Sequence, residues 1–137
     1  MKKVLVVITM FFSFFLSSSS CSAAPDWYWL TSTDSRSYYV DRSCGIWDKM
    51  ELHVSLKTVG TDGKYRLINL VAKYKNGPEI YLKNETVFAY DANGRYLFHY
   101  VDKEWQKVKS NTVGATIAIK LFELYEGHFE RDNHIPE

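Results

Sequence analysis

A strict alternation of apolar and polar residues in the middle of the chain constrains the fold most. Between Met50 and Val59, Leu52, Val54 and Leu56 point one way, and the charged or polar residues between them point the other. This period of two is typical of a β-strand with one buried face and one solvated face. The pattern therefore predicts a half-buried strand in an antiparallel sheet.

Further strands are predicted where similar patterns are separated by turn residues. Asp62 and Gly63 predict a two-residue type I′ hairpin, because both central residues of that turn need a positive φ. The stretch from Asp91 to Gly94 suits a type I turn with Asp at its first position and Gly at its last. The predicted strand segments are 27–31, 37–41, 50–59, 65–73, 79–83, 86–90 and 95–101.

The last part of the chain changes to an apolar spacing of three and four residues. Asn111 or Thr112 can cap a helix N-terminus, and an apolar stripe follows. It consists of Val113, Ile117, Leu121, Leu124 and Tyr125. Gly127 is the predicted stop, with 127–137 as a frayed tail, and a strand over 116–122 is the alternative. The predicted fold class is α+β, an antiparallel meander of five to six strands with one C-terminal amphipathic helix packed on it.

The N-terminus has the three-part layout of a secretion signal. A basic start is followed by an apolar run from Val4 to Leu16 and a small polar stretch. The run is shorter than the roughly 20 apolar residues that a membrane-spanning helix needs, and no later segment is long enough to span. We expect residues 1–23 to be a signal peptide, and 24–137 to be one domain in the periplasm, at the cell surface or secreted.

The processing site depends on a few residues. Small residues at the −3 and −1 positions favour cleavage after Ala23, whereas cleavage after Ala24 would leave Pro25 as an unfavourable new N-terminus. Cys21 offers a lipoprotein alternative, in which the chain is cut before the cysteine and acylated. Lipoprotein signals normally have an aliphatic residue three places earlier, where this chain has Ser18. We therefore expect no lipid anchor at Cys21.

The composition of the remaining 114 or so residues excludes some classes of protein. Without Lys2 and Lys3, 15 basic residues face 16 acidic ones, a net charge of about −1. A nucleic-acid binder would normally be basic. The length suits a single core. With Cys21 removed, Cys44 would be the only cysteine and could form no disulfide within the chain. We therefore expect Cys44 to be buried as a small hydrophobic side chain. An intermolecular disulfide or a reactive thiol is the alternative.

No set of residues has the pattern of a catalytic site, so we expect no enzymatic activity and no cofactor. Glu51 and His53 share the solvated face of a strand, but no nucleophile or oxyanion site accompanies them. Imidazole and carboxylate groups that could bind a metal gather near the C-terminus. They are His128, Glu130, Asp132 and His134. A terminal tail lacks the rigid elements and supporting hydrogen bonds of a metal site, so we expect no metal there.

Two aromatic groups are candidates for partner binding. Across the last hairpin, Phe88 and Tyr90 are predicted to share one face with Tyr96, Phe98 and Tyr100. Such a ladder is either core or an exposed platform. In the following loop, Trp105 is surrounded by Lys103, Lys107 and Lys109. This basic, aromatic loop could contact an acidic partner, and ordinary surface charge is the alternative.

The order of these features resembles the surface-adhesin E family of exported bacterial proteins. Residues 27–30 and 38–41, with Ser43 and Cys44, are similar to its aromatic first strand and its Y-[VY]-D-x-x-S-[IV] segment. Residues 90–94, then 105–108 and a closing helix, are similar to its ending. The chain departs from the pattern at Cys44, which replaces an aliphatic residue, and after Trp105, where Pro and Ser are out of register.

The resemblance implies an exported or lipid-anchored protein with an antiparallel sheet and a helix. It also implies, for the adhesins, binding to host extracellular-matrix and plasma proteins, and it implies no catalytic residues. We therefore expect a non-enzymatic, protein-binding module whose partners are host extracellular or envelope proteins. A small secreted hydrolase, or an inhibitor of one, is the alternative. Converging His, Asp or Glu in a pocket would favour the enzyme, and an exposed sheet edge or aromatic patch would favour binding.

Overall fold

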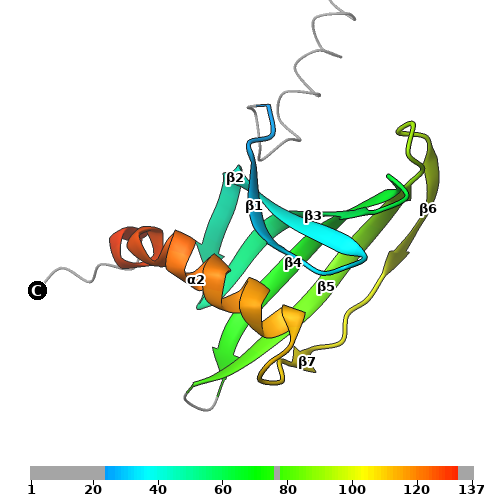
Figure 1. Cartoon of the computed structure of the whole chain (residues 1–137). Helices are drawn as coiled ribbons and strands as arrows, with labels where there is room; N and C mark the ends of the chain where they lie inside the picture. Colours follow the sequence, from blue (N-terminus) through cyan, green and yellow to red (C-terminus); the bar gives the residue numbers. More distant parts are fainter. Residues whose placement is uncertain (1–23, 76–77, 133–137) are drawn as a thin grey trace, which may run out of the picture.

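Consecutive strands of the chain lie side by side in one curved antiparallel sheet, and a helix crosses one of its faces (Figure 1). The computed structural model describes residues 24–75 and 78–132, without the side chains of 127–132. The elements are β1 (Trp27–Ser32), β2 (Arg36–Asp48), β3 (Glu51–Gly60), β4 (Tyr65–Lys75), β5 (Glu79–Tyr90), β6 (Tyr96–Val101), β7 (Gln106–Lys107) and α2 (Val113–Asp132). The sheet order is β1 to β6, and the short β7 pairs with β5. The predicted α+β meander with a C-terminal helix is confirmed.

Two strands are longer than the alternation predicted. β2 continues to Asp48, because a register shift between Val40 and Gly45 lets it go on pairing with β3. The segments 79–83 and 86–90 form the single strand β5, which passes an irregularity opposite β4. A bulge of this kind breaks the apolar alternation without ending the ladder. Sequence periodicity alone therefore divided one strand into two.

The turns agree with prediction in one case and differ in another. At Asp62 and Gly63 only the glycine has a positive φ, of 82°, and the Gly63 amide donates to the Gly60 carbonyl at 3.0 Å. This is a type I turn followed by a left-handed glycine, not the predicted type I′ turn. The Gly94 amide donates to the Asp91 carbonyl at 3.1 Å, which confirms the predicted turn there.

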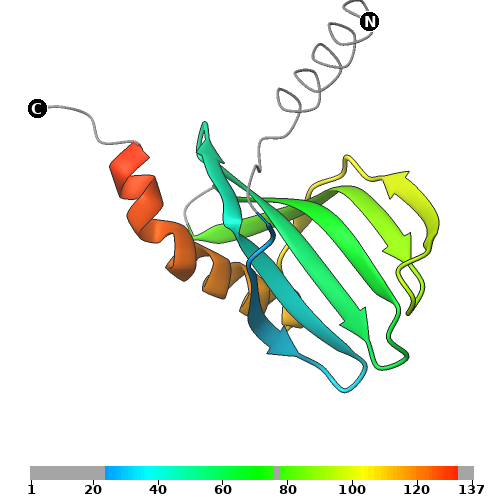
Figure 2. The same ribbon diagram turned by 90° about the horizontal axis from the view of Figure 1, so that it is seen from above.

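The helix α2 covers one face of the sheet, as Figures 1 and 2 show. Its apolar side packs against β1 to β4 in one core. The buried members are Leu30, Val40, Leu52, Val54, Leu56, Leu70, Ala72, Ile117, Leu121, Phe122 and Tyr125. Burying a side chain of this size stabilises the fold by about 1.5–3 kcal/mol. The predicted stripe is confirmed at Ile117, Leu121 and Tyr125, and Leu124 is partly buried against the core, whereas Val113 is exposed.

The sequence predicted the start of α2 correctly but not its end. Thr112 caps the N-terminus, as predicted, with its hydroxyl oxygen accepting a bond from the Ala115 amide at 3.2 Å. The helix does not end at Gly127 but continues to Asp132. The imidazole and carboxylate side chains considered as metal ligands, from His128 onward, are not among the side chains that the structure describes. In the described part of the chain, no helix has both the length and the apolar character to cross a bilayer.

Three long-range hydrogen bonds attach α2 to β1 and β2. The Trp47 indole nitrogen donates to the Tyr125 carbonyl at 3.0 Å, and the Tyr125 hydroxyl donates to the Asp41 carbonyl at 3.1 Å. The Lys120 ammonium group donates to the Leu30 carbonyl. These bonds fix the angle of the helix on the sheet, and they bring residues from opposite ends of the domain together.

Asp41 is a buried carboxylate at the centre of this attachment. It accepts bonds from the Asp26 amide at 2.9 Å, the Ser43 amide at 3.0 Å and the Ser43 hydroxyl at 2.6 Å. Burial alone would raise the pKa of Asp41, but the Ser43 hydroxyl and the two amides more than offset it, and the pKa is lowered. The Asp and Ser of the resemblance motif therefore have a structural role.

Cys44 lies in the irregular stretch of β2. It was predicted to be a buried thiol, but it is half-buried and takes part in a disulfide bond. The chain has one other cysteine, Cys21, which lies outside the described residues. The reactive-thiol alternative is therefore wrong for this state of the protein, because a disulfide sulfur is not a thiolate.

Candidate functional site

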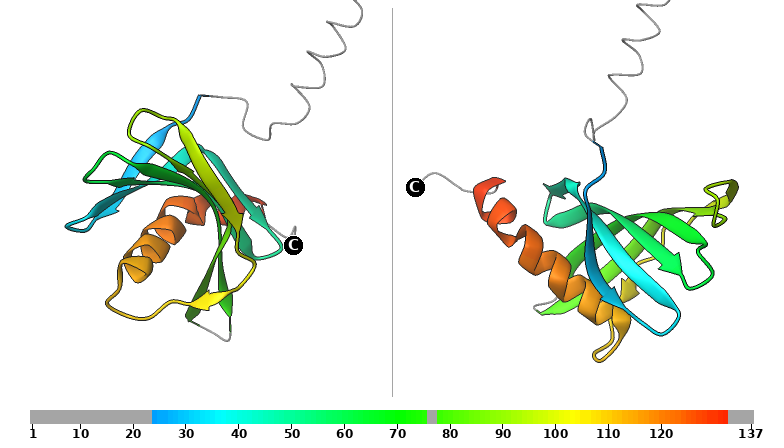
Figure 3. Two further views of the ribbon diagram at one scale, coloured as in Figure 1. Left: turned by 90° about the vertical axis from the view of Figure 1, so that its right-hand side faces the viewer. Right: turned by 45° about the horizontal axis from the view of Figure 1, so that its top comes forward.

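The β6 strand is an exposed edge of the sheet, on the side away from α2 (Figure 3). All six of its residues are exposed, and five are large and apolar. They are Tyr96, Leu97, Phe98, Tyr100 and Val101. An edge strand offers unpaired backbone N–H and C=O groups to another chain. Natural edges are usually protected by Lys, Pro or other charged residues, and β6 contains neither Lys, Arg, Asp, Glu nor Pro.

The aromatic residues of the β5–β6 hairpin were predicted to share one face. The structure shows that this prediction is wrong. Phe98 pairs with Ala89 and Tyr96 with Tyr90, so that Leu97 is an extra residue at a register shift. Because side chains alternate along a strand, this shift puts Tyr96 and Phe98 on opposite faces. The ladder is therefore divided between the helix-side face and the outer face of the sheet.

The outer-face rings hold one another in place. Tyr90 stacks on Tyr65, with ring centroids 4.9 Å apart, and meets Tyr96 edge-on at 6.1 Å. Phe88 stacks on His99 at 5.6 Å. Contacts of this kind contribute about 0.5–1.5 kcal/mol each beyond burial. The outer rings thus support the hairpin, whereas Phe98 and Tyr100 lie on the other face and face solvent.

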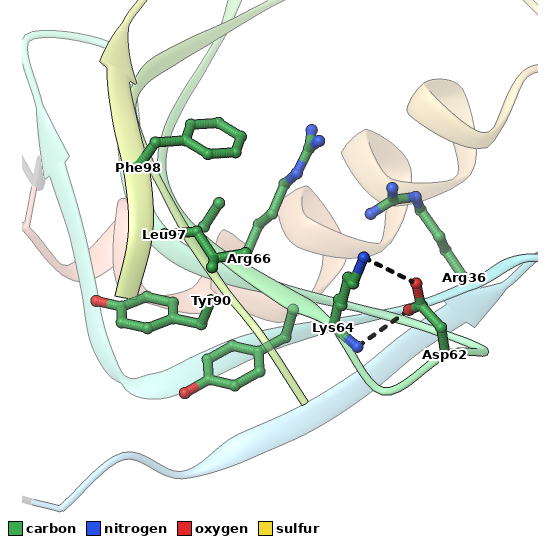
Figure 4. Close-up of a pocket in the computed structure, with 10 residues that line it drawn as sticks. Arg36, Asp62, Lys64, Arg66, Tyr90, Leu97 and Phe98 are labelled. Carbon is green, nitrogen blue, oxygen red and sulfur yellow. Dashed lines mark hydrogen bonds and ion pairs between the residues drawn. The ribbon is translucent and has the colours of Figure 1, made fainter. Parts of the chain in front are cut away.

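A small basic cavity lies beside β6 (Figure 4). Its volume is about 220 Å³, and Leu97 and Phe98 from β6 contribute apolar surface to its lining. Arg36 from β2 and Arg66 from β4 contribute guanidinium groups. The Arg36 guanidinium donates to the Thr58 hydroxyl at 3.5 Å. Ligand sites usually measure about 300–1,000 Å³, so this cavity is sized for one side chain rather than a whole cofactor.

The charges around this cavity are predominantly positive. The Lys64 ammonium group lies 4.0 Å from the Asp62 carboxylate, an ion pair that Figure 4 marks with a dashed line. The charges of these two side chains therefore largely cancel. Neither Arg36 nor Arg66 forms an ion pair with any residue that the structure describes. Guanidinium groups bind carboxylates through charge-assisted, often bidentate, hydrogen bonds. The cavity therefore suits a carboxylate carried on an apolar segment.

The residues predicted for partner binding do not form one site. The Trp105 ring lies between two ammonium groups, that of Lys73 at 3.8 Å from its centroid and that of Lys83 at 4.6 Å. Lys107 belongs to β7 and forms an ion pair with Glu79 at 2.9 Å. That hydrogen bond and the charge of Glu79 raise the pKa of Lys107, and the pKa of Glu79 is lowered in return. Lys103 and Lys109 are exposed. Trp105 thus packs on the outer face of the sheet instead of presenting a free ring.

The Glu51 and His53 pair is on one face, as predicted, with a carboxylate oxygen 3.5 Å from His53 Nε2. A second cavity of about 220 Å³ on the outer face is lined partly by His53, Ser55 and Glu85. Within the described residues, His53 Nε2 is buried without a hydrogen bond, and Ser55 makes no side-chain bond to it. No group of three potential metal ligands is present in the part of the chain that the structure describes. None of the described residues that line this cavity forms a hydrogen bond with His53 Nε2, the contact by which a histidine base would activate a nucleophile.

Comparison of the chain with protein-family models, with curated proteins and with solved structures finds no match.

Proposed function

We propose that this protein is an exported, non-enzymatic binding module that pairs an extended segment of a partner protein with β6. The observation that carries the proposal is an apolar edge strand, exposed along its whole length, beside a cavity whose two arginines form no ion pair with any described residue. Residues 1–23 act as the secretion signal. The partner is an extracellular host or envelope protein, which agrees with the resemblance to the surface-adhesin E family.

Strand addition explains why both features lie together. In this mode of recognition, backbone hydrogen bonds supply affinity, and pockets for alternate side chains supply specificity. A strand added to β6 would place every second side chain on the helix-side face, next to Phe98 and Tyr100. One of these side chains, an Asp or Glu, would reach Arg36 and Arg66 in the basic cavity.

The test is binding of the processed protein to a panel of purified extracellular-matrix and plasma proteins, measured by biolayer interferometry. Phe98→Lys and Tyr100→Lys place charges on the edge, and each is expected to reduce affinity at least about tenfold. The matched control is Tyr28→Lys on β1, the opposite edge, which should bind like the unmodified protein. The double variant Arg36→Ala, Arg66→Ala should lower the affinity, and the affinity that remains should depend less on salt concentration. Equal loss at both edges, or no binding to any panel protein, would reject the proposal.

The hydrolase or inhibitor alternative rests on the cavity at His53. A hydrolase would need Ser55 or another nucleophile within about 3.2 Å of a base. The structure gives His53 a Glu51 neighbour, and among the described residues no hydroxyl forms a hydrogen bond with His53 Nε2. A loss of hydrolysis of a nitrophenyl ester in His53→Ala, with no loss in Phe98→Lys, would favour the alternative.

Export itself has a separate test, the intact mass of the protein recovered outside the cytoplasm. Cleavage after Ala23 would give a chain that starts at Ala24 and carries no lipid. Within one chain, however, a disulfide at Cys44 requires Cys21 to be retained. A mass that includes Cys21 and is two hydrogens below the reduced value would contradict the signal boundary at residue 23. An added diacylglyceryl group at Cys21 would identify a lipoprotein.

A further inference from the structure

We propose a second binding site, at the opposite ends of the strands from the basic cavity, that takes a lysine- or arginine-bearing apolar segment of a partner protein. The site is a cavity of about 340 Å³ between residues 119–126 of α2 and the ends of β2 and β4. Its apolar lining consists of Trp47, Met50, Tyr74, Ile119 and Phe122, and Glu123 and Glu126 complete it. We call it the acidic groove.

The floor of the acidic groove is rigid. Phe122 is only 7% exposed, and its ring stacks on Tyr74 at 4.3 Å and on Trp47 at 5.8 Å. The hydrogen bond from the Trp47 indole nitrogen to the Tyr125 carbonyl holds the third ring against α2. Three rings in contact from β2, β4 and α2 therefore form a preorganised apolar surface, which lowers the entropy cost of binding.

Large apolar side chains are concentrated at the rim. Met50 is 61% exposed, Tyr74 51% and Ile119 52%. Scattered apolar residues on a surface are normal, but a contiguous group that flanks a cavity marks an interaction site. Methionine adapts its shape to different ligands, because its side chain is unbranched and polarizable.

The backbone at the rim is held in a costly conformation. Lys49 and Met50 connect β2 to β3 with φ values of 48° and 68°, the left-handed region that favours glycine and asparagine. A non-glycine residue in this region is disfavoured sterically, and it persists when the surrounding structure determines it. This tight turn keeps Met50 beside the cavity. The strain is an observation independent of the cavity, and it concerns the same few residues.

The charge of the acidic groove selects the ligand. Neither Glu123 nor Glu126 forms an ion pair with a residue that the structure describes. Burial raises the pKa of the Tyr74 hydroxyl, and the negative charge of Glu126 raises it further. The Glu126 carboxylate therefore acts electrostatically on a side chain that lines the cavity. The nearby Lys75 ammonium lies over the Tyr81 ring, 5.4 Å from its centroid, and Lys49 does not line the cavity.

An apolar floor with carboxylates at its rim is complementary to a long alkyl stem that ends in a cation. Lysine and arginine have this structure, and they bury the stem while the charged head stays near water. Ammonium and guanidinium groups also bind favourably over aromatic faces. The volume lies in the range of ligand sites and exceeds what one such side chain fills. The occupant is therefore a basic residue together with an apolar neighbour, as in a peptide segment.

The experiment is a titration of the folded protein with the peptide acetyl-Leu-Lys-Leu-Lys-Leu-amide, followed through the Trp47 indole N–H resonance in nitrogen–proton NMR spectra. We expect saturable shifts with a Kd of about 1 mM or below. A peptide with glutamate in place of lysine, and one with norleucine, should each bind at least about tenfold more weakly. Butylamine alone should bind more weakly too, because it lacks the apolar neighbours; equal affinity would identify a small-amine site and overturn the proposal.

Variants separate this site from the β6 edge. Glu123→Gln with Glu126→Gln should weaken the lysine peptide at least about tenfold while leaving the fold intact, and Tyr74→Ala should weaken it as well. The matched control is Glu85→Gln with Glu104→Gln, which should bind normally. Phe98→Lys should also bind the peptide normally, so failure here and failure of the β6 proposal are distinguishable. Unchanged affinity in the double glutamine variant, or no shift of Trp47, would refute the site.

Discussion

The helix-covered region, β1 to β4 under α2, and the β6 edge belong to the same sheet and have opposite properties. In the covered region, apolar residues from β1 to β4 and α2 form one core. At β6, residues of equal size and apolarity are all exposed. Apolar composition therefore does not decide burial here. The position of a single helix decides it, because α2 is long enough to cover only part of a sheet this wide.

This difference separates the residues that determine stability from those of the proposed binding edge. Substitutions in the covered region remove buried contacts and should act on the free energy of unfolding. Substitutions at β6 remove little buried surface, so they should act on partner binding alone. The comparison predicts a graded series of effects, from the centre of the core to the edge.

The largest effect is expected for Leu121→Ala, in the centre of the core. Leu121 is fully buried, and its truncation should lower the free energy of unfolding by about 2–5 kcal/mol in a urea titration. Ile119→Ala is the control, because Ile119 is mostly exposed, and it should cost about 1 kcal/mol or less. Equal losses at both positions would mean that α2 does not present the face described here.

A somewhat smaller effect is expected for Gly45→Ala, where β2 passes under α2. A Cβ atom at this position would lie 2.1 Å from the nearest ring atom of Tyr125, which is buried and cannot move without losing its bond to the Asp41 carbonyl. Overpacking of this kind costs about 1–3 kcal/mol, occasionally more. Gly114→Ala, with no atom nearer than 3.7 Å, should be neutral or stabilising. A thermal melt showing no loss for Gly45→Ala would contradict the close packing of α2 on β2.

The Asp41 carboxylate should make stability depend on pH at the acidic end. Its pKa is lowered below the ordinary 3.8, so its contribution is complete above that value and is lost as the pH falls through the lower, folded pKa. We expect the free energy of unfolding to fall below about pH 4 in the unmodified protein. In Asp41→Asn, stability near pH 7 should be lower by about 1–3 kcal/mol, and this acid-dependent part should be reduced. Parallel pH curves for the two proteins would show that Asp41 is not the group responsible.

The smallest effect on stability is expected for Phe98→Lys at the edge. Because Phe98 already faces solvent, its replacement should change the free energy of unfolding by less than about 0.5 kcal/mol. The same substitution should still weaken partner binding, as proposed above. A loss of more than 1 kcal/mol or so would place Phe98 in the core and remove the contrast between the two regions.

Regular alternation and regular spacing predicted most of the fold. Leu52, Val54 and Leu56, together with Ile117 and Leu121, identified the sheet face and the helix side that form the core. Lys120 shows where this reasoning fails: the helical spacing alone predicts that it faces solvent, yet its ammonium group lies 5.0 Å from the Trp29 ring centroid and bonds to β1. Such a contact depends on the helix position, which periodicity does not encode.

The candidate sites were predicted far less well, for three physical reasons. The shift at Leu97 adds one residue to β6 and reverses which face the aromatic rings occupy, and no residue type in that strand signals a bulge. The turn at Lys49 and Met50 has the positive φ values of a type I′ hairpin without its usual Asn or Gly. The basic loop around Trp105 was recognisable as a group, but cation–π contacts to Lys73 and Lys83 from other strands decide its role.

The hydrogen bond from Tyr125 to Asp41 has a consequence for the order in which the chain acquires its structure. It joins residues 84 positions apart, and the bond from Lys120 to Leu30 spans 90. The hairpins between neighbouring strands are local and can form early, whereas contacts of such high sequence separation form slowly. Docking of α2 is therefore expected to be the last step. A nascent chain therefore cannot complete its core until α2 has been made.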